Sequence, residues 1–293
     1  IHNVYEVPKS LQRQWAARSY HGSEQNNARG VINRFLGHWD GNPATLIPLS
    51  PSDSAPLYVE MMGGSDKIMA KGRELIGQGK YLHAVEILDR LVFAEPRNQP
   101  ARDLLADAYE QLGYQKESPS VRNSFLQGAY ELRSGMPTGN PVTSSGPDVV
   151  RAMSTDQWLD FLGISMDPKR ADGLRLTINL VTPDNGEKYL IELSNATLTN
   201  IKGIQSPKPD LTITVDRAEL NRVMLGVATF DQLGQEGKAR FDGDRTAITK
   251  LRDLMVTFTP DFEFIPGSAP EKRQVPPGRP FALPELNLHL NAE

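Results

Sequence analysis

The periodicity of apolar residues changes once along this chain of 293 residues, and that change constrains the fold most strongly. From Tyr58 to Arg133, apolar and small residues recur at spacings of three, four or seven, which predicts a series of amphipathic helices. From Leu174 to Val215, apolar and polar residues alternate in short runs, which predicts strands. Residues 135–147 between them are rich in Gly, Pro, Ser and Thr and predict a linker. We therefore expect an α+β multidomain chain, in which an all-α domain precedes an α+β domain.

The helical part has the features of a tetratricopeptide-like repeat. Gly79 and Gly113 lie about 34 residues apart, one repeat length, and each is expected to close a helix. Asn98, between Pro96 and Pro100, is expected to mark the start of the next helix. Two such repeats leave an apolar end uncovered, so we expect a second copy of the chain to cover it in a homodimer.

Composition excludes several classes of function. A net charge of -4 gives no electrostatic reason to bind nucleic acid, so no nucleic-acid partner is expected. No apolar run reaches the roughly 18 to 20 residues that span a bilayer, so no transmembrane segment is expected. The chain has no cysteine, which excludes disulfides, thiolate metal sites and a cysteine nucleophile, and which fits an exported or a cytosolic bacterial chain.

The N-terminal stretch from Tyr20 to Leu49 reads as the end of an active site rather than a complete one. The chain opens at Ile1 without an initiator methionine, and we expect that a segment upstream of it has been removed. The five histidines lack the HxH or i,i+4 spacing that places two imidazoles on one metal. They are His2, His21, His38, His83 and His289. A complete metal centre is therefore not expected within this chain.

Several sequence blocks resemble the alkyl sulfatases of the metallo-β-lactamase superfamily. The N-terminal blocks are YHGS at 20–23, GHWDGNPATL at 37–46 and YVEMMGG at 58–64. LVFAEPRNQPARDLLADAYEQLGYQKES at 91–118 is similar to the dimerisation domain of that family. LTITVDRAELNRVMLG at 211–226 and GKARFDGDRTAITKL at 237–251 resemble its sterol-carrier-protein-2-like (SCP2-like) domain.

This resemblance implies a division of the chain into five parts. Residues 1–52 would be an active-site-adjacent segment at the end of a metallo-β-lactamase-like domain, and 53–136 a helical dimerisation domain. A linker at 137–150 would lead to the SCP2-like domain at 151–265. Residues 266–293 would form a tail whose many prolines and lack of helical period predict that it lies extended across a neighbour or is mobile.

The resemblance also implies an activity and a cofactor. The family hydrolyses long-chain alkyl sulfate esters, such as dodecyl sulfate, at a centre of two zinc ions whose ligands lie mostly upstream of the dimerisation domain. One ligand histidine should fall at the position of Asn26, where asparagine offers zinc only a weak neutral oxygen. His21, five residues earlier, is the candidate metal ligand that could replace it, against the alternative that His21 is structural. The expected location is bacterial and periplasmic or secreted, with the cytoplasm left open.

Two further sets of residues have a functional and a structural interpretation. Arg18, Arg29 and Arg34 could hold a sulfate through their guanidinium groups, although a solvated helix face explains them better. Trp15, Trp39, Tyr58, Met61 and Met62 could line an alkyl-chain tunnel, although packing of the first helices explains them better. The turn at Asp40 to Pro43 could border the active-site mouth, and we favour a structural turn.

The leading interpretation is the C-terminal portion of a zinc-dependent alkyl sulfatase that supplies dimerisation and apolar substrate recruitment. The alternative is a non-catalytic dimeric binding protein for lipid-like or surfactant-like molecules, which Asn26 favours. A third hypothesis, a peptide-binding scaffold, is disfavoured because such repeats usually come in longer arrays.

Overall fold

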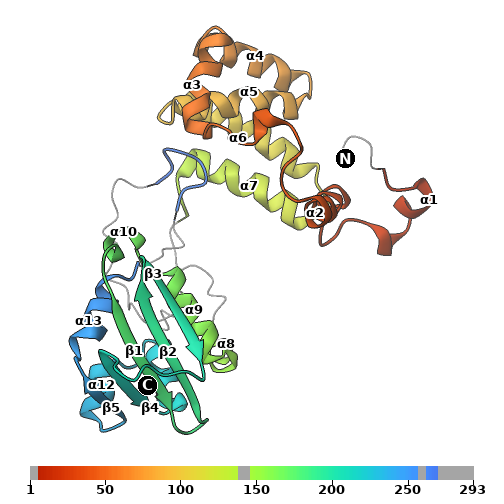
Figure 1. Cartoon of the computed structure of the whole chain (residues 1–293). Coiled ribbons are helices and arrows are strands. Elements are labelled where there is room, and N and C mark those ends of the chain that lie inside the picture. The colour runs from red at the N-terminus through yellow and green to blue at the C-terminus, as the bar shows by residue number, and fades with distance from the viewer. Residues whose placement is uncertain (1–5, 138–145, 257–261, 270–293) are drawn as a thin grey trace, which may run out of the picture. The chain divides into compact units, whose positions relative to one another are not determined.

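The computed structural model of the chain describes residues 6–137, 146–256 and 262–269 (Figure 1). The described residues form two compact units. Residues 6–137 and 262–269 belong to the first, which we call the helical unit, and residues 146–256 to the second, the sheet unit. Most of the expected linker (138–145), most of the expected tail (270–293), His2 and His289 lie outside the described residues.

The helical unit begins with short elements and ends in a packed array of antiparallel helices. The short elements are α1 (Lys9–Gln12), η1 (Trp15–Ala17), α2 (Glu24–Leu36) and η2 (Pro43–Thr45). The packed helices are α3 (Pro51–Met61), α4 (Ser65–Gly77), α5 (Tyr81–Ala94), α6 (Gln99–Tyr114) and α7 (Pro119–Ser134). Helix α5 packs against α3, α4 and α6, and α6 packs against α7. The expected all-α domain is confirmed, while its tetratricopeptide-like character stays a prediction.

The chemistry of the helix ends agrees with most of the expectations. Asn98 caps α6, because its side-chain oxygen accepts a hydrogen bond from the backbone amide of Ala101 at 3.1 Å. Gly79, with φ of 70°, follows α4 in the conformation that ends helices. Gly113 was expected to close a helix and instead lies inside α6. A Cβ atom there would meet Leu126 at 2.9 Å, so this glycine allows the close packing of α6 on α7.

The sheet unit contains a mixed sheet of five strands in the order β3-β2-β1-β4-β5. Its strands are β1 (Leu176–Thr182), β2 (Glu187–Ser194), β3 (Thr197–Lys202), β4 (Leu211–Val215) and β5 (Ala239–Gly243). Strands β1 and β4 are parallel, and the other neighbouring pairs are antiparallel. The sequence predicts β1 to β4 and misses β5, because ARFDG is short and contains only two apolar side chains, Ala239 and Phe241.

The helices of the sheet unit share one core with the sheet. They are α8 (Pro147–Ala152), α9 (Thr155–Ile164), α10 (Pro168–Ala171), α11 (Arg217–Met224), α12 (Phe230–Gln235) and α13 (Thr246–Asp253). The positions of Thr229 and Asp216 just before apolar helical patterns predict that they cap the helices that follow. Thr229 caps α12 in a capping box. Asp216 precedes α11, but its side chain makes no capping hydrogen bond. Asp184, from the β1–β2 turn, instead accepts hydrogen bonds from the backbone amides of Arg217 at 2.6 Å and Ala218 at 3.2 Å.

Candidate functional site

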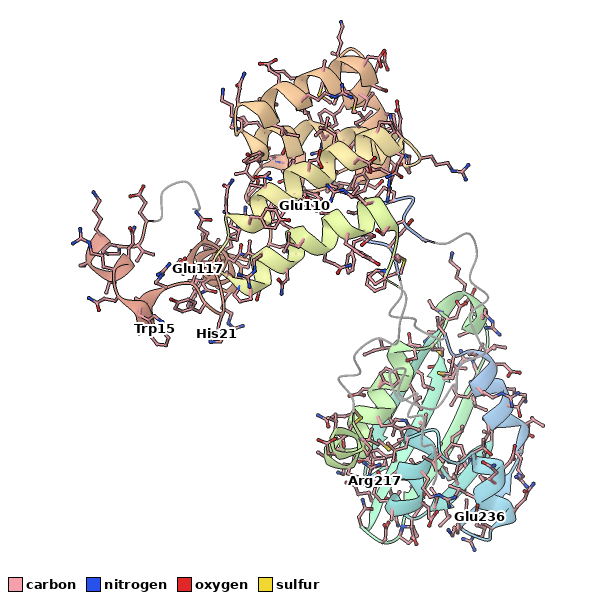
Figure 2. The ribbon with its side chains drawn as sticks, turned by 180° about the vertical axis from the view of Figure 1, so that it is seen from behind. Trp15, His21, Glu110, Glu117, Arg217 and Glu236 are labelled. Carbon is pink, nitrogen blue, oxygen red and sulfur yellow. The ribbon has the colours of Figure 1, made fainter. Side chains whose placement is uncertain are left out.

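The N-terminal segment lies against the start of α7 through two contacts. The Arg18 guanidinium forms an ion pair of 2.5 Å with the Glu117 carboxylate. The hydroxyl of Ser120 donates a hydrogen bond to the backbone carbonyl of His21 at 3.2 Å. Figure 2 shows His21 and Glu117 beside each other at this end of the helical unit. The contact to His21 uses its backbone, so the imidazole takes no part in holding the segment in place.

His21 and Asn26, the two residues connected with metal binding, are both exposed. Asn26 lies in the first turn of α2, and its backbone amide donates to the hydroxyl of Ser23, the residue that caps this helix. Within the three described ranges, no group of three or more His, Asp or Glu side chains lies close enough together to hold a metal ion. The described residues therefore do not form a zinc site, and a ligand role for His21 stays a prediction.

The arginines considered for sulfate binding lie on different parts of the N-terminal segment. Arg18 is paired with Glu117, and its guanidinium lies 5.8 Å from the ring centre of Tyr20. Arg29 and Arg34 lie further along the chain, on α2, and are exposed. An ion pair with a carboxylate neutralises the charge that would attract a sulfate, which disfavours Arg18 as a sulfate ligand. The proposed sulfate role of Arg29 and Arg34 stays a prediction.

The N-terminal segment exposes an unusually large number of apolar side chains. None of α1, η1, α2 and η2 contains a buried residue. Phe35 on α2 is 81% exposed and Ile47 is 88% exposed. The other large exposed apolar residues of this segment and the following helix are Leu11, Trp15, Val31, Leu36, Trp39, Leu46, Leu49, Leu57, Tyr58 and Met61. Packing of the first helices is the favoured interpretation of Trp15, Trp39, Tyr58, Met61 and Met62. The first four are exposed, whereas Met62 is partly buried and packs against the core of the helical unit.

An apolar cavity lies in the sheet unit between the sheet and helices α9, α12 and α13. Its lining comprises Trp158, Leu159, Leu162, Ile178, Leu180, Ile191, Ile213, Phe230, Ile248 and Leu251. Nine of these residues are buried, and only Ile248 on α13 is partly exposed. The cavity volume is about 20 Å³, which is close to the space that one water molecule needs.

The lining of this cavity suits an apolar ligand. Its lining contains no charged side chain, so any ligand inside it is held by burial of apolar surface. A long alkyl chain does not fit into the volume of one water molecule, so its entry requires a movement of the covering helices. The sequence predicted the strand residues of this core from their alternation. It did not predict the contributions of Trp158, Phe230 and Ile248, which come from three separate helices.

At the edge of the sheet, polar side chains satisfy one another around Glu187. Its carboxylate accepts hydrogen bonds from the hydroxyl of Thr155 and the side-chain amide of Asn185, both at 3.0 Å, and from the ammonium of Lys202. The hydrogen bond from Lys202 lowers the pKa of Glu187, and this effect is larger than the opposite effect of burial, which raises the pKa. The side chains of this group are paired with one another and contribute to the stability of the fold.

No described helix is both long enough and apolar enough to cross a membrane. This observation concerns helices within residues 6–137, 146–256 and 262–269 alone.

Comparisons with known proteins give consistent matches to both units. A family model described as "Alkyl sulfatase dimerisation" matches residues 1–135, and one described as "Alkyl sulfatase C-terminal" matches residues 143–267. A linear primary-alkylsulfatase from Pseudomonas sp is 38% identical over 259 residues, which are 88% of this chain and 38% of that protein. The chain therefore spans about two fifths of the length of this relative.

The solved structure of an alkylsulfatase agrees with these sequence matches. The structure of the stereoselective inverting sec-alkylsulfatase Pisa1 from Pseudomonas sp. superposes with a TM-score of 0.81 at 37% identity, over 90% of this chain and 41% of that chain. Sterol Carrier Protein 2 Like 2 from Aedes Aegypti matches 38% of this chain and 100% of its own length, with a TM-score of 0.29 at 20% identity.

Proposed function

This chain belongs to the alkyl sulfatase family through its dimerisation and C-terminal domains, and we propose from this membership that it forms part of an enzyme that hydrolyses long-chain alkyl sulfate esters. The observation that carries the proposal is the 38% identity to a linear primary-alkylsulfatase across 88% of the chain. Hydrolysis of such an ester by water yields an alcohol and inorganic sulfate. Dodecyl sulfate is the substrate we propose to test first.

In this proposal the helical unit brings two copies of the chain together. The match to the dimerisation domain supports a homodimer. The exposed apolar side chains of α2 and the following loop, among them Phe35 and Ile47, supply a surface whose burial would stabilise the association.

The sheet unit would collect the alkyl chain of the substrate in its apolar cavity. Each methylene group moved from water into such a site contributes roughly 0.8 kcal/mol. Chain length would therefore govern affinity, provided that the covering helices separate enough to admit the chain. The sulfate would stay outside the cavity, because the lining has no polar group to replace its hydration.

The proposal includes zinc because the resemblance to the alkyl sulfatases of the metallo-β-lactamase superfamily implies it. The described residues form no group that could bind a metal ion. His21 is exposed, and within the described part of the chain it belongs to no group of three or more His, Asp or Glu side chains that could hold a metal ion. We therefore assign the two zinc ions to residues other than those described, with Asn26 as a departure from the expected ligand set. A periplasmic or secreted location is likewise proposed from the family.

The test is zinc-dependent release of sulfate from dodecyl sulfate by the native protein purified from its source. We expect release that a chelator abolishes and added zinc restores, and an intact mass well above the 32.5 kDa of this chain. Magnesium at the same concentration is the matched control for restoration. The absence of sulfate release from metal-loaded native protein would contradict the proposal.

A dimeric binding protein for lipid-like or surfactant-like molecules is the second candidate. Asn26, at the position where a ligand histidine is expected, favours it. This candidate predicts dodecyl-chain binding by the native protein without zinc-dependent sulfate release, so the same experiment separates the two functions.

A further inference from the structure

Residues 262–269, which follow the sheet unit in the sequence, lie on the helical unit. We propose that α6 and α7 form a binding site for a peptide segment in a turn conformation, and that its ligand is residues 262–269 of this chain. This site fastens the chain that follows the sheet unit to the helices. The proposal is independent of the alkyl sulfatase function.

Arg102 on α6 supplies the donors of this site. Its side chain is only 3% exposed, yet each of its nitrogens has an acceptor. Nη1 donates to the backbone carbonyl of Pro266 at 2.7 Å, and Nη2 donates to the hydroxyl of Ser268 at 2.8 Å. The remaining hydrogen bonds go to the carbonyls of Pro96, Glu131 and Leu132 within the helical unit. A buried guanidinium that uses its donors on both the helices and the segment joins the two.

Glu131 on α7 supplies the matching acceptor. Its side chain is 2% exposed, and its Oε1 atom accepts hydrogen bonds from the backbone amides of Phe264 and Ile265, both at 3.0 Å. A buried carboxylate without such partners would carry a large desolvation cost. The site thus recognises both the amide groups and the carbonyl groups of the segment backbone.

Three residues of the segment give the site its sequence preference. The side chain of Ile265 is buried in the core of the helical unit. Gly267 has φ of 79°, and a Cβ atom there would lie 2.6 Å from the backbone oxygen of Pro96. The carbonyl of Ser268 accepts a hydrogen bond from the amide of Met136 at 3.1 Å, next to the end of α7. Glu263 stabilises a turn within the segment, because its carboxylate accepts hydrogen bonds from the backbone amides of Ser268 and Ala269.

The consequence concerns the connection between the units. The sheet unit is joined to the helical unit by the covalent chain on both sides, and the segment binds α6 and α7 directly after the second connection. Residues 262–265 pack with the helices in this structure, and the expected boundary of the SCP2-like domain at residue 265 stays a prediction. Along the described residues, the sheet unit lies in the sequence between two parts of the helical unit.

The test uses the full chain with a protease site placed within residues 257–261. After cleavage, we expect the C-terminal fragment to co-elute with the rest of the protein and to be displaced by an excess of a synthetic peptide of residues 262–269. A peptide with Gly267→Ala should bind at least about tenfold more weakly, because its Cβ would collide with Pro96. A Phe262→Ala peptide is the matched control and should bind within about twofold, because Phe262 is largely exposed.

Hydrogen exchange on the uncut chain gives a second measurement that does not depend on cleavage. The amides of Phe264, Ile265 and Met136 should be protected, and Gly267→Ala should lower their protection at least about tenfold while β1 keeps its protection. Rapid exchange of these three amides in the unaltered chain would overturn the proposal. Separation of the fragment from a still folded body, or equal binding of the Gly267→Ala peptide, would overturn it as well.

Discussion

The guanidinium of Arg102 and the hydroxyl of Ser268, which are 166 positions apart in the sequence, form a hydrogen bond of 2.8 Å in the interior of the helical unit. The Arg102→Met substitution keeps most of the apolar stem but removes all the donors, which leaves buried carbonyls without partners. Each unsatisfied buried group costs about 1 to 3 kcal/mol, so we expect a loss of about 3 kcal/mol or more in the free energy of unfolding of the helical unit. Urea denaturation measures this loss.

Arg97, close to the α5–α6 turn, provides the control for Arg102. Its side chain is exposed, so Arg97→Met should change the free energy of unfolding by less than about 0.5 kcal/mol. Equal effects of the two substitutions would show that the buried hydrogen bonds of Arg102 contribute nothing specific.

Glu187 makes the stability of the sheet unit depend on pH. Its hydrogen bond from Lys202, which outweighs burial, holds the pKa of the carboxyl below its ordinary value of 4.5. The folded state therefore binds fewer protons than the unfolded state near this pKa. The resulting stability is present above pH 4.5 and is lost as the pH falls through the folded-state pKa.

We expect Glu187→Gln to lower the free energy of unfolding of the sheet unit by about 1 to 2 kcal/mol at pH 7, because a charge-assisted acceptor is lost. The ion pair between Glu187 and Lys202 is partly exposed to solvent, which weakens it and keeps the expected loss of stability modest. The difference from the parent chain should shrink as the pH falls below 4.5, which thermal unfolding across pH 3 to 7 tests. Glu192→Gln, on an exposed position of β2, is the control, and a difference for Glu187→Gln that persists at pH 3 would contradict this account.

The sequence predicts those parts of the fold that depend on residues close to one another in the chain. Alternation of apolar residues predicts β1 and β4, and Asn98 and Thr229 cap the expected helices because the capped amides lie within three residues. The resemblance to the alkyl sulfatases is also confirmed. Several long sequence blocks that follow one another in the same order as in a family identify that family.

The features that the sequence does not predict depend on distant partners. Asp184 caps α11 from another element, so local spacing pointed to Asp216 instead. Arg102 and Glu131 look like ordinary charged residues of amphipathic helices, and only the return of residues 262–269 explains their burial. The lining of the cavity comes from separate helices and strands, and no local pattern marks residues that meet only in the folded state.

Gly163 on α9 tests the close packing of this helix on β3. A Cβ atom at Gly163 would lie 3.0 Å from the backbone oxygen of Leu198, which cannot rotate away as a side chain can. Alanine favours a helix by about 1 kcal/mol relative to glycine, while the forced separation costs about 1 to 3 kcal/mol. We expect Gly163→Ala to destabilise the sheet unit by about 1 kcal/mol in a thermal unfolding experiment.

Gly77 at the end of α4 is the matched control, because no atom lies within 4 Å of its ideal Cβ position. Gly77→Ala should stabilise the helical unit by up to about 1 kcal/mol. If Gly163→Ala is also stabilising, the contact between α9 and β3 is looser than the structure indicates.

Phe35 tests the proposed homodimer. Replacing this exposed aromatic side chain by aspartate places a charge where apolar burial is expected, so Phe35→Asp should weaken dimerisation by about tenfold or more. Sedimentation equilibrium of the native protein measures the dissociation constant. Lys169→Asp on α10 of the sheet unit controls for the general effect of added negative charge. An unchanged constant for Phe35→Asp would place the dimer contact on another surface.

Ile248 on α13 tests whether the sheet unit binds an alkyl chain. It is the partly exposed residue among the ten that line the cavity, so a chain that enters must pass it. Ile248→Trp should fill the entrance and lower the affinity for a dodecyl chain about tenfold. Ile248→Ala should widen it and leave the affinity equal or raise it about twofold, at a cost of about 1 to 3 kcal/mol in stability. Calorimetric titration with dodecyl sulfate below its micellar concentration measures both. The opposite effects of the two substitutions distinguish entry into the cavity from adsorption of detergent to the surface, because adsorption would leave the two variants alike.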